Sequence, residues 1–186
     1  MDYFFEQTFN QSNQDLILLG DYQDCVFENC RFESSDFSNF KFDNCEFIEC
    51  DFSNAKIGDV AIRDVKFTRC KMIGLNFEDA NQFNISFSFN ECNLNHSSFY
   101  KMDIRKTKFQ KCSLESVDFT EANLTLTVFD ECQLDNAIFD RCNLENSDFR
   151  TAINFNIDPN NNLIKKTKFS KDNLAGLLTK HNIIIQ

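Results

Sequence analysis

The chain has 186 residues, of which 29 are acidic and 19 basic, for a net charge of −10 at pH 7. No stretch approaches the ~18–20 apolar residues of a transmembrane helix, and four glycines are too few for phosphate-binding loops. The first 21 residues carry four acids and no Lys or Arg, which argues against a secretory signal. We therefore expect a cytoplasmic protein with neither a membrane partner nor, because of its acidity, direct nucleic-acid binding.

Residues 1–21 are predicted to form an N-terminal cap. They contain Phe4, Phe5, Phe9 and an apolar run over residues 16–19 that ends at Gly20. The periodic part of the chain follows, and the exposed end of a stacked fold needs a cover. We expect a strand or short turn in this role.

The next part of the chain has a period of five. A large apolar residue stands at nearly every fifth position from Phe27 to Phe77, and again from Leu94 to Phe149. Helices have a period of 3.6 and strands a period of two, so this pattern indicates a coil of short sides, each with one large side chain inside. A row of mostly small residues two positions earlier contains all nine cysteines. We interpret these as buried fillers in a reducing compartment, because they lack metal or disulfide spacing.

The two runs are out of register with each other, and the slip lies at residues 81–89. Gln82 would occupy an inward position if the first run continued. We therefore predict a bulge or short loop, in which Gln82, Phe83 and Asn84 are candidate partner contacts. A harmless insertion between coils is the alternative interpretation.

Residues 156–186 are predicted to form a terminal turn, a short α-helix and an apolar tail. The only proline, Pro159, interrupts the period, and Ser170 is a suitable N-cap. Helical spacing and an apolar tail point to a dimer contact, with a monomeric cap as the alternative. The predicted dimerisation residues are Leu174, Leu177, Leu178, Ile183, Ile184 and Ile185.

No catalytic constellation and no metal-ligand spacing occur, so we expect neither an enzyme nor a cofactor. The charge distribution is the remaining signal: residues 112–149 hold nine acids, with Arg141 as the only base. All nine are at outward positions of the repeat, and regularly spaced carboxylates can imitate the field of a phosphate backbone. The predicted partner-binding acidic face consists of Glu115, Asp118, Glu121, Asp130, Glu131, Asp135, Asp140, Glu145 and Asp148.

The repeats resemble the pentapeptide-repeat family, in which the third residue of each repeat is Leu or Phe. Good matches are the segments 112–116, 122–126, 142–146 and 147–151. The resemblance implies an all-β solenoid, a right-handed quadrilateral β-helix over residues 22–155 with four repeats per coil. Residues twenty apart would then stack, which places Phe99, Phe119 and Phe139 in one column and Phe109, Phe129 and Phe149 in the opposite one.

Residues 168–185, and the segment 60–70, are similar to the Qnr and MfpA group of this family. That resemblance implies a homodimer joined at the C-terminal ends. It also implies a DNA mimic that binds a type II topoisomerase, DNA gyrase or topoisomerase IV, and modulates it or protects it from quinolones or peptide toxins. The long loops of some Qnr proteins are missing, which weakens the expectation of quinolone resistance more than that of binding. The alternative is a structural or interaction scaffold with an unknown partner.

Overall fold

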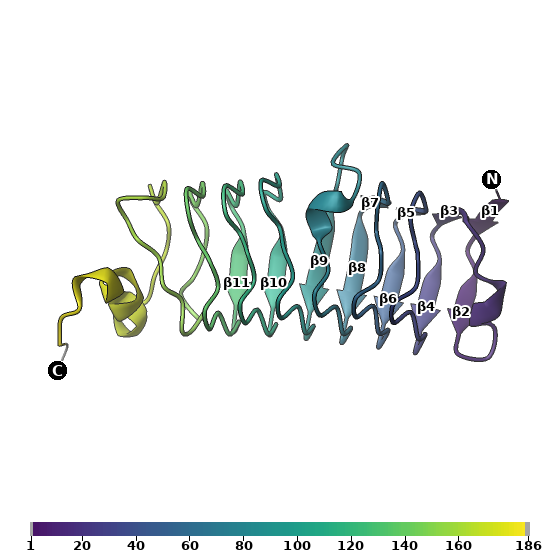
Figure 1. Ribbon diagram of the computed structural model, residues 1–186, viewed down its shortest axis with the longest axis horizontal. Helices are drawn as coiled ribbons and strands as arrows, with labels where there is room; N and C mark the ends of the chain where they lie inside the picture. The colour runs from purple at the N-terminus through teal and green to yellow at the C-terminus, as the bar shows by residue number, and fades with distance from the viewer. Residues whose placement is uncertain (1, 185–186) are drawn as a thin grey trace.

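The computed structural model describes residues 2–184 and has the form of a rod of stacked coils, with the two ends of the chain at opposite ends of the rod (Figure 1). All strand pairs are parallel, and each strand pairs with strands of neighbouring coils. The fold is therefore a parallel β-solenoid, as the period of five predicted. Its helical segments are short and of the 3-10 type.

Two sheets run along the rod, on adjacent sides of the coils. The first has the order β1 (Asp2–Phe5), β3 (Gly20–Gln23), β5 (Lys41–Asp43) and β7 (Ala61–Arg63). The second has the order β2 (Thr8–Asn10), β4 (Val26–Glu28), β6 (Glu46–Ile48), β8 (Val65–Thr68), β9 (Phe87–Asn90), β10 (Lys108–Gln110) and β11 (Val128–Asp130). Isolated parallel bridges such as Asp118↔Ile138 join the coils on the remaining sides.

The corners of the coils depend on a left-handed backbone conformation that recurs at five-residue intervals. Asn29, Asn39, Asn44 and Asn54, for example, have φ between 49° and 67°. Asn tolerates this region better than most residues, which explains the abundance of Asn in the repeats. The N–H groups at these corners donate to carbonyls of the next coil, for example Asn44 N–H to Arg63 O at 2.9 Å. Each turn is thus tied into the stack.

Phenylalanine rings fill the interior. One column runs the length of the rod with successive ring centroids 4.5–5.6 Å apart, and its members are Phe9, Phe27, Phe47, Phe67, Phe89, Phe109, Phe129, Phe149 and Phe169. A second column holds Phe77, Phe99, Phe119 and Phe139, whose stacked centroids are 4.5–5.3 Å apart. The predicted columns are confirmed, and the interior is a packed core.

The cysteines are fillers, as predicted. All nine are free and buried. Several donate to carbonyls of the coil before, for example Cys50 Sγ to Phe27 O at 3.3 Å and Cys132 Sγ to Phe109 O at 3.3 Å. The small thiol therefore satisfies a backbone acceptor while occupying a space too small for a larger side chain.

The register slip is a two-residue insertion in one corner. Ala61 pairs with Asn81, twenty residues on, whereas Val65 pairs with Phe87, twenty-two residues on. The extra residues lie within 82–86, and this corner projects beyond its neighbours between β7 and β9 (Figure 1). The short 3-10 helix η2 (Phe77–Asp79) precedes it. After the insertion the twenty-residue repeat resumes.

The N-terminal residues join the stack. β1 pairs with β3 and β2 with β4, each at an offset of eighteen residues, and Phe4 stacks on Tyr22 with centroids 4.5 Å apart. The 3-10 helix η1 (Gln14–Leu16) connects them to the next coil. These residues therefore form the first coil of the stack, two residues shorter than the regular coils.

At the other end, parallel bridges continue beyond residue 155, where we expected the coils to stop. Asn143 pairs with Leu163 and Asp148 with Lys168. The buried Asn162 accommodates the interruption at Pro159, because its Nδ2 donates to Phe139 O and its Oδ1 accepts from Cys142 N–H. The side-chain amide thus replaces backbone pairing that the irregular segment cannot provide.

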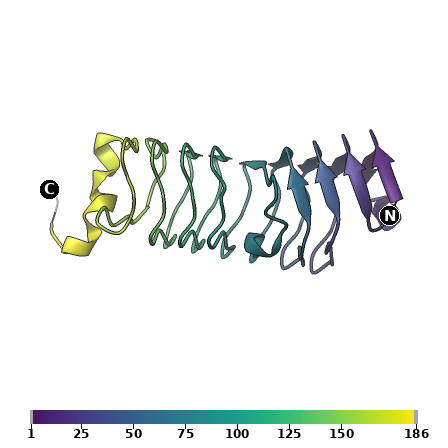
Figure 2. The same cartoon turned by 90° about the horizontal axis from the view of Figure 1, so that it is seen from above.

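The C-terminal segment is helical, but its turns are 3-10 rather than the predicted α: η3 (Lys171–Leu177) and η4 (Thr179–His181). They lie across the end of the rod (Figure 2). Gly176 O accepts from Ile157 N–H at 3.0 Å, so this carbonyl serves the last coil. Ser170 stands at the N-cap without a side-chain capping bond. Asn173 Nδ2 instead donates to Phe149 O and Ala152 O, so contacts with the last coil determine this segment.

Candidate partner-binding surfaces

The nine predicted carboxylates encircle the rod. We name the four sides after the inward residues of one coil: Leu114, Phe119, Leu124 and Phe129. The pairing registers distribute the acids as follows: Glu115 and Asp135 on the Leu114 side, Asp118, Glu121 and Asp140 on the Phe119 side, Glu145 on the Leu124 side, and Asp130, Glu131 and Asp148 on the Phe129 side. All nine are at least partly exposed. They form a belt rather than one face.

Three of the nine are held in ion pairs. Glu121 lies between Arg141 at 2.9 Å and Lys101 at 3.5 Å, in the coils above and below. The hydrogen bond from Arg141 lowers the pKa of Glu121, with Lys101 adding to the effect. Asp148 binds Arg150 at 2.8 Å, and this hydrogen bond lowers its pKa. Asp140 binds Arg141 at 2.8 Å. The two pairs of Glu121, and the contact of Asp148 with Lys168 at 3.8 Å, join neighbouring coils, whereas the pairs with Arg150 and of Asp140 with Arg141 lie within one coil. All of them reduce the free negative charge.

A negative feature without ion pairs lies where the Leu114 and Phe119 sides meet. Glu115, Asp118 and Asp135 stand here, and we call this set the acidic edge. The segments 93–98, 113–118 and 133–138 that build it contain no Lys or Arg. Amide and backbone donors hold the carboxylates in place: Asn154 Nδ2 lies 2.9 Å from Asp135, and Thr120 N–H lies 2.8 Å from Asp118. The carboxylates are thus oriented without being neutralised by a cation.

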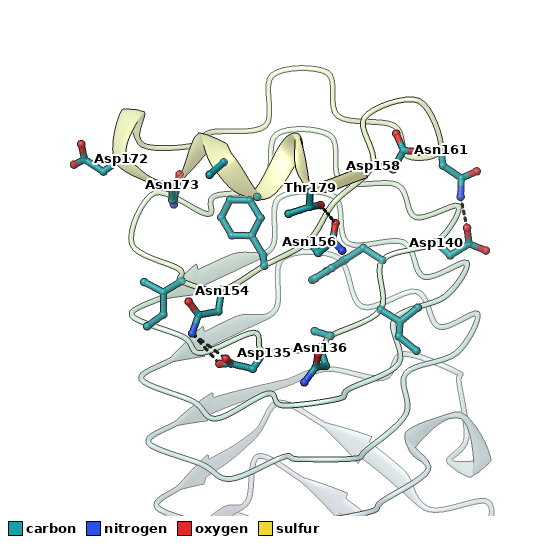
Figure 3. Close-up of a pocket in the computed structure, with 17 residues that line it drawn as sticks. Asp135, Asn136, Asp140, Asn154, Asn156, Asp158, Asn161, Asp172, Asn173 and Thr179 are labelled. Atoms are coloured by element: carbon teal, nitrogen blue, oxygen red, sulfur yellow. Dashed lines mark hydrogen bonds between the residues drawn. The ribbon is translucent and has the colours of Figure 1, made fainter. Parts of the chain in front are cut away.

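A groove of about 910 Å³ opens at the C-terminal end of the acidic edge, between the last coils and η3 (Figure 3). Its walls carry Asp135, Asp140, Asp158 and Asp172 together with several Asn side chains, and its apolar lining includes Phe155. No Lys or Arg is among its lining residues. Lys180, which is not a lining residue, forms an ion pair with Asp158. The groove therefore extends the acidic edge toward the end of the rod.

The predicted dimerisation residues divide into two groups. Leu174, Leu178, Ile183 and Ile184 are exposed, Ile184 by 87%. Leu177 is partly buried and packs against the core of its own chain, so it covers the last coil. Ile185 lies outside the described residues. The end of the rod thus leaves apolar side chains uncovered.

The predicted loop contacts are all exposed, Phe83 by 69%. Gln82 Nε2 donates to Ala80 O at 3.0 Å, Phe83 N–H donates to Asn81 Oδ1 at 3.0 Å, and Asn84 has the left-handed conformation. The loop lies where the Leu124 and Phe129 sides meet, diagonally across the rod from the acidic edge. One flat partner surface cannot contact both at once.

Sequence reasoning missed three exposed apolar residues near the C-terminal end: Ile138, Ile153 and Leu163. Ile153 pairs with Gln133 and Leu163 with Asn143, so both occupy outward positions where the repeats usually carry polar residues. An apolar residue at an outward position of the repeat was the sequence feature that could have identified them.

Between residues 2 and 184, no group of three or more His, Cys, Asp or Glu side chains is arranged to hold a metal ion. His96 is exposed at a corner of the coil. No helix in the same range is long and apolar enough to cross a membrane.

The chain belongs to the pentapeptide-repeat family: the model described as "Pentapeptide repeat region" matches residues 21–88 and 86–169. Two trypsin-treated variants of QnrB1, a plasmid-mediated fluoroquinolone resistance protein, have the same fold. They align with TM-scores of 0.66 at 15% and 14% identity, over 99% of this chain and 97% and 98% of theirs. HetL, a pentapeptide-repeat protein involved in heterocyst differentiation regulation from the cyanobacterium Nostoc sp., aligns with a TM-score of 0.47 at 8% identity, over 89% of this chain and 84% of its own. No curated protein sequence matches.

Proposed function

We propose that this protein is a DNA mimic of the Qnr type that binds a type II topoisomerase, DNA gyrase or topoisomerase IV, without being an enzyme. The observation that carries the proposal is the acidic edge of Glu115, Asp118 and Asp135, which continues into the acidic groove. Within the described residues, the three carboxylates of the acidic edge have no cation at ion-pair distance, whereas Asp140 and Asp158 in the groove are ion-paired. The fold of the rod matches QnrB1 over almost the whole chain. A basic DNA-binding surface would attract such an edge as it attracts phosphates.

The mimic acts as a homodimer in this proposal. The exposed Leu174, Leu178, Ile183 and Ile184 supply apolar surface at the end of the rod, and burial against a second copy removes it from water. Two acidic edges then flank the centre of a longer rod. Sedimentation equilibrium should give twice the chain mass, and Leu174→Glu with Leu178→Glu should give a monomer with an unchanged β-sheet spectrum. A monomeric native protein would remove the dimer from the proposal.

A supercoiling assay tests the function directly. Purified gyrase, and separately topoisomerase IV, is titrated with the protein at low and moderate salt, with and without ciprofloxacin. We expect inhibition, or rescue from the drug, that weakens as salt rises, because the contact is ionic. No effect on either enzyme at any salt concentration would contradict the proposal.

A structural or interaction scaffold is the second candidate, and one observation favours it. The nine carboxylates surround all four sides, and Glu121 joins three successive coils through its pairs with Lys101 and Arg141, which is what a role in holding coils together requires. In that case the topoisomerases should not respond, and the acidic edge should be replaceable without loss of function.

A further inference from the structure

The two-residue insertion lies between two cationic corners. The loop 82–86 is the corner that leads into β9. The same corner of the preceding coil leads into β8 and is flanked by Arg63 and Lys66. The same corner of the following coil leads into β10 and carries Arg105, Lys106 and Lys108. β9 pairs with both β8 and β10, with Lys66 opposite Ser88 and Ser88 opposite Lys108. Lys66 and Lys108 are therefore roughly 10 Å apart along the rod, two strand spacings, with the loop between them. We call these five cations and the loop the basic edge.

The charges of the basic edge are largely free. Within residues 2–184, Arg63, Lys66, Lys106 and Lys108 have no carboxylate at ion-pair distance, whereas Arg105 is paired with Asp103 at 2.8 Å. The Nε of Arg63 is buried without a hydrogen-bond partner in the same range. The nearby carboxylate of Asp64 accepts a hydrogen bond from Ser86 Oγ at 3.0 Å and binds no cation. Asp43 and Glu46 stand opposite Arg63 and Lys66 on the neighbouring strands but do not reach ion-pair distance. An anionic ligand would thus find several cations outside direct ion pairs on both sides of the loop.

Phe83 adds an aromatic surface at the tip. Its side chain is 69% exposed, and the Arg63 guanidinium lies over the ring at 5.9 Å from its centroid. An exposed ring costs free energy in water, and the contact with Arg63 leaves most of this side chain uncovered. A ring between flanking cations offers what an unpaired base and its phosphates require: a stacking face and charge along one line.

We propose that the basic edge binds single-stranded nucleic acid, with Phe83 stacking on a base and Arg63, Lys66, Lys106 and Lys108 contacting phosphates. A projecting corner cannot enclose a duplex, and the ring can stack only on a base whose face is open. The net charge of −10 does not prevent this, because the acidic edge lies diagonally across the rod, and Asp130 and Glu131 lie on the Phe129 side at the end away from the loop corner. This inference does not depend on the proposed topoisomerase partner.

Fluorescence anisotropy with a labelled twelve-residue oligothymidylate tests the proposal. We expect binding at 50 mM KCl that weakens about 50-fold by 200 mM, the salt dependence of roughly four phosphate contacts on a single strand. Phe83→Ala should weaken binding about tenfold, the effect of losing one stacked base. Its matched control is Tyr100→Ala, an exposed aromatic residue elsewhere on the rod, which should bind as the native protein does.

The double variant Lys66→Gln, Lys108→Gln should weaken binding and flatten the salt dependence, whereas Lys56→Gln, Lys111→Gln removes equal charge elsewhere and should not. Competition with poly-glutamate tests whether the basic edge binds nucleic acid specifically or binds any acidic polypeptide. Competition as strong as that of unlabelled oligonucleotide would overturn the assignment to nucleic acid. Absence of binding at 50 mM KCl, or equal losses in the test and control variants, would overturn it as well.

Discussion

Replacing Phe119 by Ala tests the columns that define the fold. The side chain is fully buried, and its ring stacks on Phe99 at 5.3 Å and on Phe139 at 5.1 Å. It also meets Phe109 and Phe129 edge-on, at 6.1 and 5.8 Å. The substitution therefore leaves a cavity in a continuous stack and removes four aromatic contacts. Large-to-small changes of this type cost about 3–5 kcal/mol, and the loss of the ring contacts points to the upper half of that range.

The assay is urea unfolding followed by circular dichroism, in parallel with Phe83→Ala. Phe83 is exposed, so its variant supplies the same chemical change without a cavity and should lose less than about 0.5 kcal/mol. A loss below about 1 kcal/mol for Phe119→Ala would show that the neighbouring coils close the cavity easily, which contradicts a tightly packed column.

Three further predictions concern the ends, the ion pairs and the thiols. Gly176→Ala should lower the melting temperature and expose the last coil to protease, because a Cβ there would lie 2.5 Å from Phe155 O; native protease resistance would refute this contact. Asp148→Asn should make the stability of the protein fall less steeply in acid. Because the pKa of Asp148 is lowered in the folded protein, its carboxylate stabilises the fold fully above its ordinary pKa of 3.8, and this contribution is lost as the pH falls below that value. Identical pH–stability curves for the variant and the native protein would exclude the ion pair. Burial raises the pKa of Cys45 and Cys142 to about 12, so we expect Ellman's reagent to label the thiols in urea but not in the native protein at pH 8; rapid native labelling would contradict their burial.

The solenoid could be predicted from the sequence because its period is local. One apolar residue in five predicted the inward positions and the small, buried cysteine positions. The stacking of residues twenty apart, and with it the Phe columns, was implied by the resemblance to the pentapeptide-repeat family. The ends could not be predicted in this way, because they depart from the period. Asn162 and Gly176 act through hydrogen bonds to the last coils, and these depend on how the chain returns to the rod.

The expectation that the nine acids share one face was wrong, because they lie on all four sides of the rod, whereas their role in binding a partner stays a prediction. The sequence held a signal that would have improved the expectation. Outward position alone does not define a face of a four-sided rod. The position of a residue within the twenty-residue coil defines its face. By this count, Glu115 and Asp135 lie on the side next to the one that carries Asp130. Ion pairs such as Glu121 with Arg141 follow from the same count.

The most direct test of the proposed function compares two charge reversals of equal size in the gyrase supercoiling assay. One variant carries Glu115→Lys, Asp118→Lys and Asp135→Lys on the acidic edge, and the other carries Asp130→Lys, Glu131→Lys and Glu145→Lys elsewhere on the belt. With both variants folded, the proposal predicts that the first loses its effect on gyrase and the second retains most of it. Equal loss, or full activity of the first variant, would contradict recognition through the acidic edge.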